Sequence, residues 1–217
     1  MSIPIPRPKP TRRPLTAIVA ATLDNGIGRE GGLPWRLPGE MKYFARVTTG
    51  EPAAPVTGEP ATGTAATTGP RAHARNAVVM GRRTWDGIPA KFRPLRERYN
   101  LVVSRTPGAV EAAALTSAYA SFEDALAGVP DDAGRVFLIG GATLYNAALP
   151  QHVDRVLLTR VLERLPCDVF LSDFTALPGW RQASHDELKE WVGWDVPEGE
   201  VEEKGIRYRY EMWVKDG

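Results

Sequence analysis

Segments typical of buried strands alternate with segments typical of helices along this chain, and that order constrains the fold more than any other feature. The strand segments are short apolar runs bounded by glycine or polar residues, as in strands that are buried on both faces. We predict strands at 15–22, 76–80, 99–104, 136–139 and 155–161, and helices at 38–48, 83–88, 143–149 and one that opens at Ser121 in a capping-box pattern. This alternation predicts an α/β fold with a central, mostly parallel sheet and flanking helices.

The last predicted strand has a different pattern from the others. Larger apolar residues alternate there with Arg207, Arg209, Glu211 and Trp213; they are Ile206, Tyr208, Tyr210, Met212 and Val214. A period of two indicates a strand with two different faces, which is typical of an antiparallel sheet. We therefore predict one domain over residues 15–217, whose sheet has an antiparallel C-terminal edge.

Two segments lack any such pattern. Residues 1–14 combine several prolines with basic residues and no acid, and the prolines prevent the amphipathic helix of a targeting peptide. We interpret residues 1–14 as a disordered N-terminal tail. Residues of about 50–75 are mostly Gly, Pro, Ala and Thr without periodicity, which predicts a disordered, low-complexity surface insert.

Composition excludes several classes of protein. The 217 residues carry a formal net charge of +1, which argues against a surface that binds nucleic acid throughout. Cys167 is the single cysteine, so no internal disulfide can form, and His73, His152 and His185 lack the spacing of a metal site. No apolar run approaches the roughly 18 residues of a membrane span. We expect a reduced cytoplasmic protein without a metal ion.

The segment 27–35 joins a glycine-rich loop to the corner Leu33-Pro34-Trp35, and Glu40 follows on the first predicted helix. Residues 26–31 match the letters of the dinucleotide pattern GxGxxG, but that pattern requires a helix to start within it. Here Pro34 and further glycine follow, so we interpret the segment as a mobile loop over a small planar ligand. An ordinary surface turn is the alternative.

Glu40 falls on the apolar face of its predicted helix, beside Phe44 and Val47. A buried carboxylate costs several kcal/mol unless it is paired or protonated, so we expect its pKa to rise toward neutrality. A ligand edge with two parallel N–H donors would satisfy both carboxylate oxygens. A glutamate at the edge of the helix that reaches solvent is the alternative.

Glycines and basic residues follow three of the predicted strands. Gly81 with Arg82, Arg83 and Thr84 follows the strand at 76–80, Ser104 and Arg105 end the next strand, and Gly140-Gly141 follows the strand at 136–139. Ligands of parallel sheets bind beyond the carboxyl ends of the strands, where helix N-termini favour anions. These elements predict phosphate binding, with solvated arginines and packing glycines as the alternative.

Together these motifs resemble the dihydrofolate reductase family in its eukaryotic, monofunctional pattern, over roughly residues 15–49 and 76–215. The resemblance implies a dihydrofolate reductase-like fold and NADPH-dependent reduction of 7,8-dihydrofolate to 5,6,7,8-tetrahydrofolate. Hydride would go to C6 of the pterin and a proton to N5, as a step of one-carbon metabolism and thymidylate supply. The resemblance also implies a cytoplasmic monomer whose partners are dihydrofolate and antifolate inhibitors, with no nucleic acid and no membrane.

The same resemblance implies roles for individual residues. It assigns catalysis to Glu40, Trp35, Leu33, Thr159 and Tyr145. Thr159 would hydrogen-bond Glu40, and a water near Trp35 would carry the proton. It assigns substrate binding to Ile18, Val19, Glu40, Met41, Phe44, Ile88, Leu95, Arg98, Ile139 and Thr159, with Arg98 on the carboxylate of the glutamate tail. It assigns NADPH binding to Ala20, Ile27, Gly28, Gly81, Arg82, Arg83, Thr84, Ser104, Arg105, Ile139, Gly140, Gly141, Ala142, Thr143, Leu144 and Tyr145.

The chain departs from the family pattern in its loop-to-helix junction, which is one residue shorter than in vertebrates, at Met41, where aromatic residues are common, and in the insert at 50–75. Two other functions remain open. One is a reductase of the same fold that acts on another pteridine or a pyrimidine, as in riboflavin synthesis. The other is a non-catalytic module that binds NADPH or RNA, although the chain lacks a basic and aromatic patch.

Overall fold

The computed structural model describes residues 13–50 and 74–216. Most of the predicted tail and insert therefore lies outside the described residues. The strands are β1 (Leu15–Ala21), β2 (Gly26–Gly28), β3 (Asn76–Gly81), β4 (Arg98–Val103), β5 (Thr116–Tyr119), β6 (Val136–Leu138), β7 (Arg155–Val161), β8 (Val169–Phe170), β9 (Trp180–Gln182), β10 (Val201–Glu203) and β11 (Ile206–Lys215). The helices are α1 (Pro38–Thr49), α2 (Arg82–Gly87), α3 (Phe122–Ala127), α4 (Ala142–Ala148) and α5 (His185–Val192). Short 3-10 turns occupy Ala90–Phe92, Pro107–Ala109 and Phe174–Ala176.

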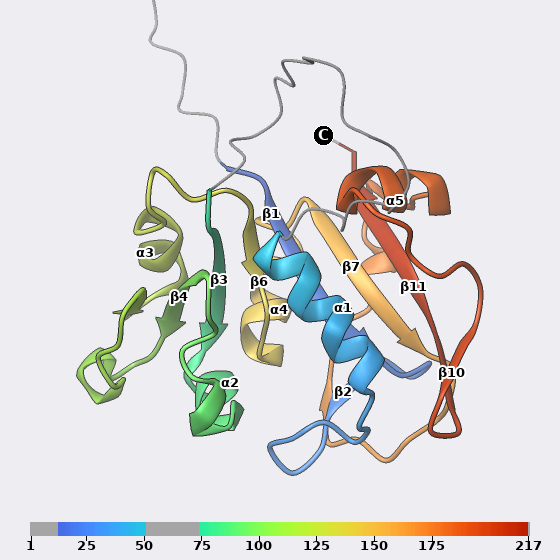
Figure 1. The fold of residues 1–217 in the computed structure, drawn as a ribbon, viewed down its shortest axis with the longest axis horizontal. Coiled ribbons are helices and arrows are strands. Elements are labelled where there is room, and N and C mark those ends of the chain that lie inside the picture. The colour runs from blue at the N-terminus through green and yellow to red at the C-terminus, as the bar shows by residue number, and fades with distance from the viewer. Residues whose placement is uncertain (1–12, 51–73, 217) are drawn as a thin grey trace, which may run out of the picture.

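One twisted sheet organises the described residues (Figure 1). Its strands follow the order β10-β11-β7-β1-β6-β3-β4-β5, and β9 pairs with β11 beside this path. All pairs from β7 to β5 are parallel, whereas β11 is antiparallel to β7, β9 and β10. The predicted α/β fold, with a mostly parallel sheet and an antiparallel C-terminal edge, is confirmed.

The two faces of the sheet carry separate apolar layers because side chains alternate along each strand. Ile18 points into a cluster with Tyr43 and Val47 of α1, and Trp85 of α2 and Leu188 of α5 belong to it. Ala17 and Val19 point the other way, into a cluster that contains residues of α3 and α4. Figure 1 shows α1 lying across one face of the sheet and α4 behind it. Both faces are thus covered, as a parallel sheet requires.

Helix α1 starts with Pro38, which suits the first turn because proline lacks the N–H that would be unpaired there. It ends at Thr49 and is capped by Gly50, whose φ of 73° is the left-handed conformation that glycine adopts most easily. Its buried residues are Glu40, Tyr43, Val47 and Thr48, so one stripe of the helix faces the sheet. The side chain of Asn76 on β3 donates through Nδ2 to the carbonyl of Thr48 at 3.0 Å and fixes the end of the helix.

The predicted elements are all present, with bounds that shift by at most one residue. The N-cap of α3 is confirmed, because Ser121 accepts a hydrogen bond from the backbone N–H of Asp124. Helix α5 was not predicted, although Ser184 and Glu187 form a complete capping box at its start. The short strands β2, β5, β8, β9 and β10 were missed too, since so few residues show no period. Within residues 13–50 and 74–216, no helix is long and apolar enough to cross a membrane.

Candidate active site

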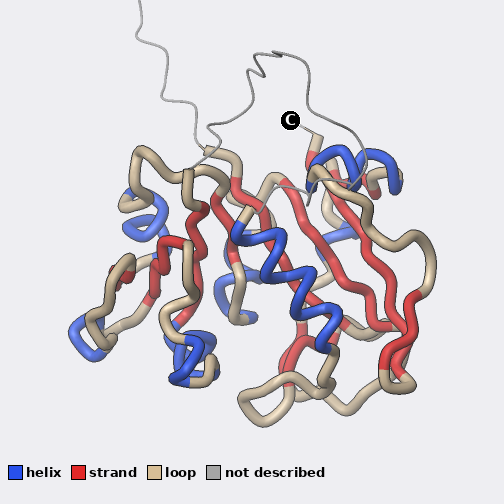
Figure 2. Tube along the Cα trace, viewed as in Figure 1, coloured by secondary structure: helices blue, strands red, loops and turns tan. Residues whose placement is uncertain are grey.

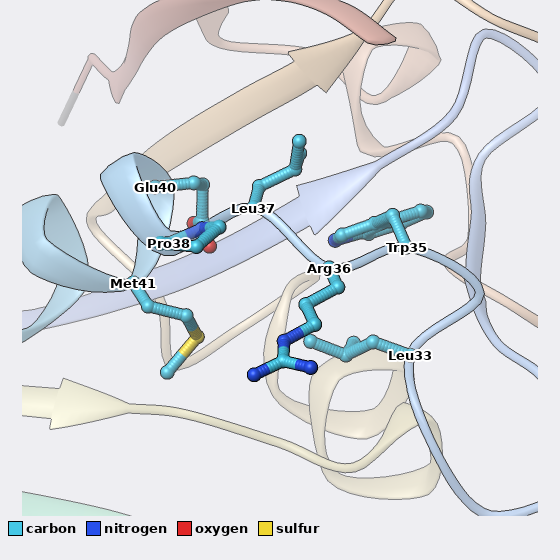
Figure 3. A pocket seen from close by; sticks show the side chains of 7 residues that line it. All are labelled: Leu33, Trp35, Arg36, Leu37, Pro38, Glu40 and Met41. Carbon is cyan, nitrogen blue, oxygen red and sulfur yellow. The ribbon is translucent and has the colours of Figure 1, made fainter. Parts of the chain in front are cut away.

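The carboxyl ends of β1, β3, β6 and β7 lie at the same edge of the sheet, where loops dominate (Figure 2). A cavity of about 230 Å³ opens there beside the start of α1. Its walls are Leu33, Trp35, Arg36, Leu37, Pro38, Glu40 and Met41 (Figure 3). Leu33 and Met41 are about half exposed, at 52% and 47%, so apolar surface is available at its rim.

Glu40 is the buried acid of this cavity, with 6% of its surface exposed. Thr159 of β7 donates through Oγ1 to Glu40 Oε1 at 3.3 Å, as the family resemblance implies. Burial raises the pKa of Glu40 to about 7; the Thr159 hydrogen bond opposes that rise and the negative charge of Glu203 adds to it. The carboxyl group can therefore hold or release a proton near neutral pH, as expected from its place on the helix.

Tyrosines surround Glu40 from three elements. Tyr43 of α1 stacks on Tyr210 of β11 with ring centroids 4.1 Å apart, and Tyr145 of α4 donates to the carbonyl of Ile18 at 2.6 Å. Burial, together with the nearby charge of Glu40, raises the pKa of all three phenols. They consequently stay neutral and add no negative charge beside the carboxylate.

Trp35 packs with Leu37, Val161 and Tyr208, which fixes the corner between the glycine-rich loop and α1. Its Nε1 is buried and has no hydrogen-bond partner among the described residues. In Figure 3 the nitrogen of the indole lies on the side that faces Glu40. A buried N–H donor of this kind calls for a partner that enters the cavity.

The glycine-rich loop is more ordered than its composition indicates. Gly26 and Gly28 of β2 pair with β8, and a Cβ on Gly26 would overlap Cys167 Sγ. Arg29 and Gly32 exchange two backbone hydrogen bonds of 2.9 Å around a tight turn. No helix starts within this loop, so the rejection of a dinucleotide pattern is confirmed, while its motion over a ligand stays a prediction.

Two glycine turns meet at the ends of β3 and β6. Gly81 donates its N–H to the carbonyl of Gly140 at 2.7 Å, and the Gly140–Gly141 peptide is cis. Gly140 has a φ of 126°, and a Cβ there would lie 3.1 Å from Thr84 Oγ1. Helices α2 and α4 begin directly after these turns, so their first N–H groups lie at the same edge as the cavity.

Of the other residues that the resemblance assigns to the cofactor near these turns, Ile139, Ala142 and Leu144 are half-buried, and Thr143 is exposed.

The basic residues beside these turns differ in their partners. Arg82 binds Asp86 within α2 through Nε at 2.8 Å, so its charge is already paired. Arg83 and Arg105 are exposed and make no ion pair within the described part of the chain. Arg105 follows β4, the strand next to β3, and the buried Ser104 accepts a hydrogen bond from the N–H of Thr106.

Arg98 lies at the start of β4, on the same face of the sheet as α1. It is buried and donates to Thr48 Oγ1 at 2.6 Å and to the carbonyl of Arg96 at 3.0 Å. Burial lowers its pKa. Half-buried Phe44, Ile88 and Leu95 belong to the apolar cluster on this face.

Some features were not predicted from the sequence. Asn100 holds the loop at Leu95 by accepting from its N–H and donating to its carbonyl. Glu203 contacts the first turn of α1, and no local pattern indicates that contact.

Val19 is the one predicted substrate residue whose side chain lies on the opposite face of the sheet from Glu40, because neighbours on a strand alternate. Within residues 13–50 and 74–216, no group of three His, Cys, Asp or Glu could hold a metal ion.

The fold and the site define a class of α/β proteins in which a buried carboxylate faces a cavity at the carboxyl edge of the sheet. The family model for dihydrofolate reductase matches residues 14–55 and 71–192. A dihydrofolate reductase from Cryptococcus neoformans var. neoformans serotype D is 43% identical, over 92% of this chain and 94% of its own. One from Pneumocystis carinii is 36% identical, over 94% and 98%. The solved structure of Schistosoma mansoni dihydrofolate reductase matches with a TM-score of 0.69 at 27% identity, over 95% of this chain and all of its own.

This chain belongs to the dihydrofolate reductase family and is an oxidoreductase. Membership of this family implies a nicotinamide cofactor.

Proposed function

We propose that this protein reduces 7,8-dihydrofolate to 5,6,7,8-tetrahydrofolate with NADPH as the reductant. The observation that carries the proposal is Glu40, a buried carboxyl group that faces a cavity and is held by Thr159. A buried acid without a cation beside it needs a ligand that supplies hydrogen-bond donors. The 2-amino group and N3 of a pterin supply two such donors side by side.

The residues at the strand ends fit a nicotinamide dinucleotide. A Cβ on Gly140 or Gly141 would lie 3.1 or 3.3 Å from Thr84 Oγ1, so a side chain would crowd this turn. Glycine leaves the backbone N–H groups open to a phosphate. Gly81, Thr84, Gly140 and Gly141 would hold the pyrophosphate, while Arg83 and Arg105 would bind the 2′-phosphate that distinguishes NADPH. When bound, the nicotinamide supplies the hydride that pterin C6 accepts.

Glu40 orients the pterin by accepting hydrogen bonds from its 2-amino group and N3. A pKa of about 7 lets the Glu40 carboxyl group take up a proton from solvent near neutral pH. The proton reaches N5 through a water that the unpaired Nε1 of Trp35 orients. Leu33 and Met41 exclude other solvent from the ring. Tyr145, fixed by its hydrogen bond to Ile18, forms the wall of the nicotinamide side.

Arg98 binds the α-carboxylate of the glutamate tail. Its hydrogen bond to Thr48 fixes the guanidinium before substrate arrives, which reduces the entropy lost on binding. Phe44, Ile88 and Leu95 form the apolar slot for the aminobenzoyl ring. From the family resemblance we also expect a cytoplasmic monomer that antifolates inhibit by competing for Glu40.

The test is the loss of absorbance at the NADPH band, measured with and without dihydrofolate. Glu40→Gln should lower turnover by about 100-fold or more, because the amide has no negative charge and presents an N–H to the donors of the pterin. Glu190→Gln, a change on α5 away from the cavity, serves as the matched control. Oxidation of NADPH that does not depend on dihydrofolate, or near-normal turnover of Glu40→Gln from about pH 6 to 8, would refute the proposal.

A further inference from the structure

Glu203 reaches the start of α1 from the far end of the chain. The hairpin of β10 and β11 carries it there, and the N–H of Gly39 donates to its Oε2 at 2.9 Å and its Oε1 at 3.1 Å. Helix α1 has Leu37 at its N-cap and no side-chain cap of its own. Glu203 therefore supplies the capping carboxylate from outside the helix, at the end where the helix dipole favours a negative charge.

The close approach of Glu203 depends on Gly39. A Cβ on Gly39 would stand 2.9 Å from Glu203 Oε2 and 3.3 Å from Tyr208 Oη. Tyr208 also donates to Glu203 Oε2 at 3.4 Å, and its ring packs edge-to-face on Tyr210 with centroids 5.5 Å apart. The carboxylate of Glu203 is thus held by Gly39 of α1 and Tyr208 of β11. Gly39 directly precedes Glu40 in the chain.

We propose that Glu203 is a positioning residue for Glu40, which fixes the first turn of α1 and controls the protonation of Glu40 through its own negative charge. This inference rests on the proposed function only for its effect on turnover. The direction of the effect is set by Coulomb's law, since a second negative charge nearby opposes the ionisation of Glu40. The raised pKa of Glu40 includes this contribution from Glu203.

The other groups that face Glu40 act differently. Thr159 of β7 donates to it and favours the ionised form. Tyr43 of α1, Tyr145 of α4, and Tyr208 and Tyr210 of β11 face it as neutral phenols whose pKa values are raised. Arg36 lines the same cavity, but its guanidinium lies on the side of Leu33 and Met41 (Figure 3). Among the described groups, Glu203 is the carboxylate whose negative charge opposes the ionisation of Glu40.

Two variants separate the cap from the charge. Glu203→Gln keeps an acceptor oxygen for the N–H of Gly39 and removes the charge, whereas Glu203→Ala removes both. Glu202→Gln is the matched control, because Glu202 is the exposed neighbour on the same strand. The main readout is the titration of Glu40 in the ligand-free protein by carbon-13 NMR of the glutamate carboxyl groups, with the resonance assigned by Glu40→Gln.

We expect the Glu40 titration to move down by roughly 0.5 to 1 pH unit in both Glu203 variants and to stay in place in Glu202→Gln. The matching limb of the pH profile of kcat/KM should move with it. Glu203→Gln should melt close to the parent, and Glu203→Ala several degrees lower. An unchanged Glu40 titration in Glu203→Gln would reduce Glu203 to a helix cap and overturn the inference. Because this titration needs no substrate, failure of the parent to turn over dihydrofolate would refute the proposed function alone.

Discussion

Glu40 makes the folded protein less stable at the pH at which it would act. Its pKa rises from 4.5 to about 7 on folding, mainly because burial removes the carboxylate from water. The folded state therefore binds more protons than the unfolded state between these two values, and stability falls as pH rises through that window. The stability that the protonated group contributes is complete below about 4.5 and lost above about 7.

Glu40→Gln should accordingly stabilise the ligand-free protein at pH 8 while it removes activity. A shift from 4.5 to about 7 corresponds to an upper limit of about 3 kcal/mol in the free energy of unfolding. Urea denaturation of parent and variant at about pH 8 and pH 4.5 measures the difference, which should shrink at the lower pH. Glu202→Gln should show no such pH-dependent gain. If Glu40→Gln is less stable than the parent at both values, Glu40 does not carry a buried charge.

Single residues could be predicted where their own segment carried the signal. The helical period on either side of Glu40 indicated its burial, and the buried side chain agrees. The same reasoning could not find Glu203, because its contact with Gly39 joins residues 164 positions apart. The ion pair of Arg82 with Asp86 was missed as well. The two residues lie four apart, and that spacing brings their side chains together only when both are in one helix, whereas the predicted helix began after Arg82.

At the scale of elements, the join between α1 and β3 has one clear consequence. The hydrogen bond from Asn76 to Thr48 brings the end of the helix against the start of the strand, so a short connection could span them. The intervening residues contain few large apolar side chains, and the dihydrofolate reductase family model leaves residues 56–70 unmatched.

Deletion of residues 52–72 should leave both folding and turnover intact. Loop-closure entropy changes by only about 0.6 kcal/mol for each doubling of loop length, so the effect should be neutral or slightly stabilising. We would compare the melting midpoint and turnover of the deletion variant with those of the parent. A variant with an equally long Gly/Ser segment in place of 52–72 is the control. A melting midpoint lower by more than several degrees, in both variants, would show that the native insert packs against the domain.

Elements were predictable in proportion to their length and pattern. The buried strands and the long amphipathic α1 were found, because several residues in each repeat the same burial. Strands β10 and β8 are as short as β6, but β6 is fully buried and reads as an apolar run, whereas β10 and β8 are half-buried or exposed. Each is held by its partner strand instead. Helix α5 was missed although the sequence carries both its capping box and a short apolar stripe, which is Leu188, Trp191 and Val192.

At the scale of the whole molecule, the sheet order brings Arg83 and Arg105 together from separate segments. They follow β3 and β4, which are neighbours in register from Asn76–Arg98 to Gly81–Val103. The order of the strands along the chain allowed β3 and β4 to be neighbours in the sheet but did not require it, because consecutive strands of a parallel sheet are not always neighbours. The fold class was therefore predictable, whereas the exact strand order came only with the structure.

Arg83→Ala combined with Arg105→Ala should weaken NADPH much more than NADH. Only NADPH carries the 2′-phosphate, and each charge-assisted contact contributes roughly 1.5–3 kcal/mol. The dissociation constant for NADPH should then rise at least about tenfold, as followed by quenching of tryptophan fluorescence. NADH is the internal control and should change little. An equal loss for both cofactors would assign these arginines to the pyrophosphate or to the fold.

The central position of β1 has a consequence for how the protein is made. Its two neighbours in the sheet are β6 and β7, which end at Leu138 and Val161, so β1 stays unpaired until these later strands have left the ribosome. Such non-local pairing slows folding and leaves an apolar segment exposed to aggregation in the nascent chain. Synthesis in chain order therefore delays assembly of the site until the hairpin of β10 and β11 has emerged and Glu203 has contacted the first turn of α1.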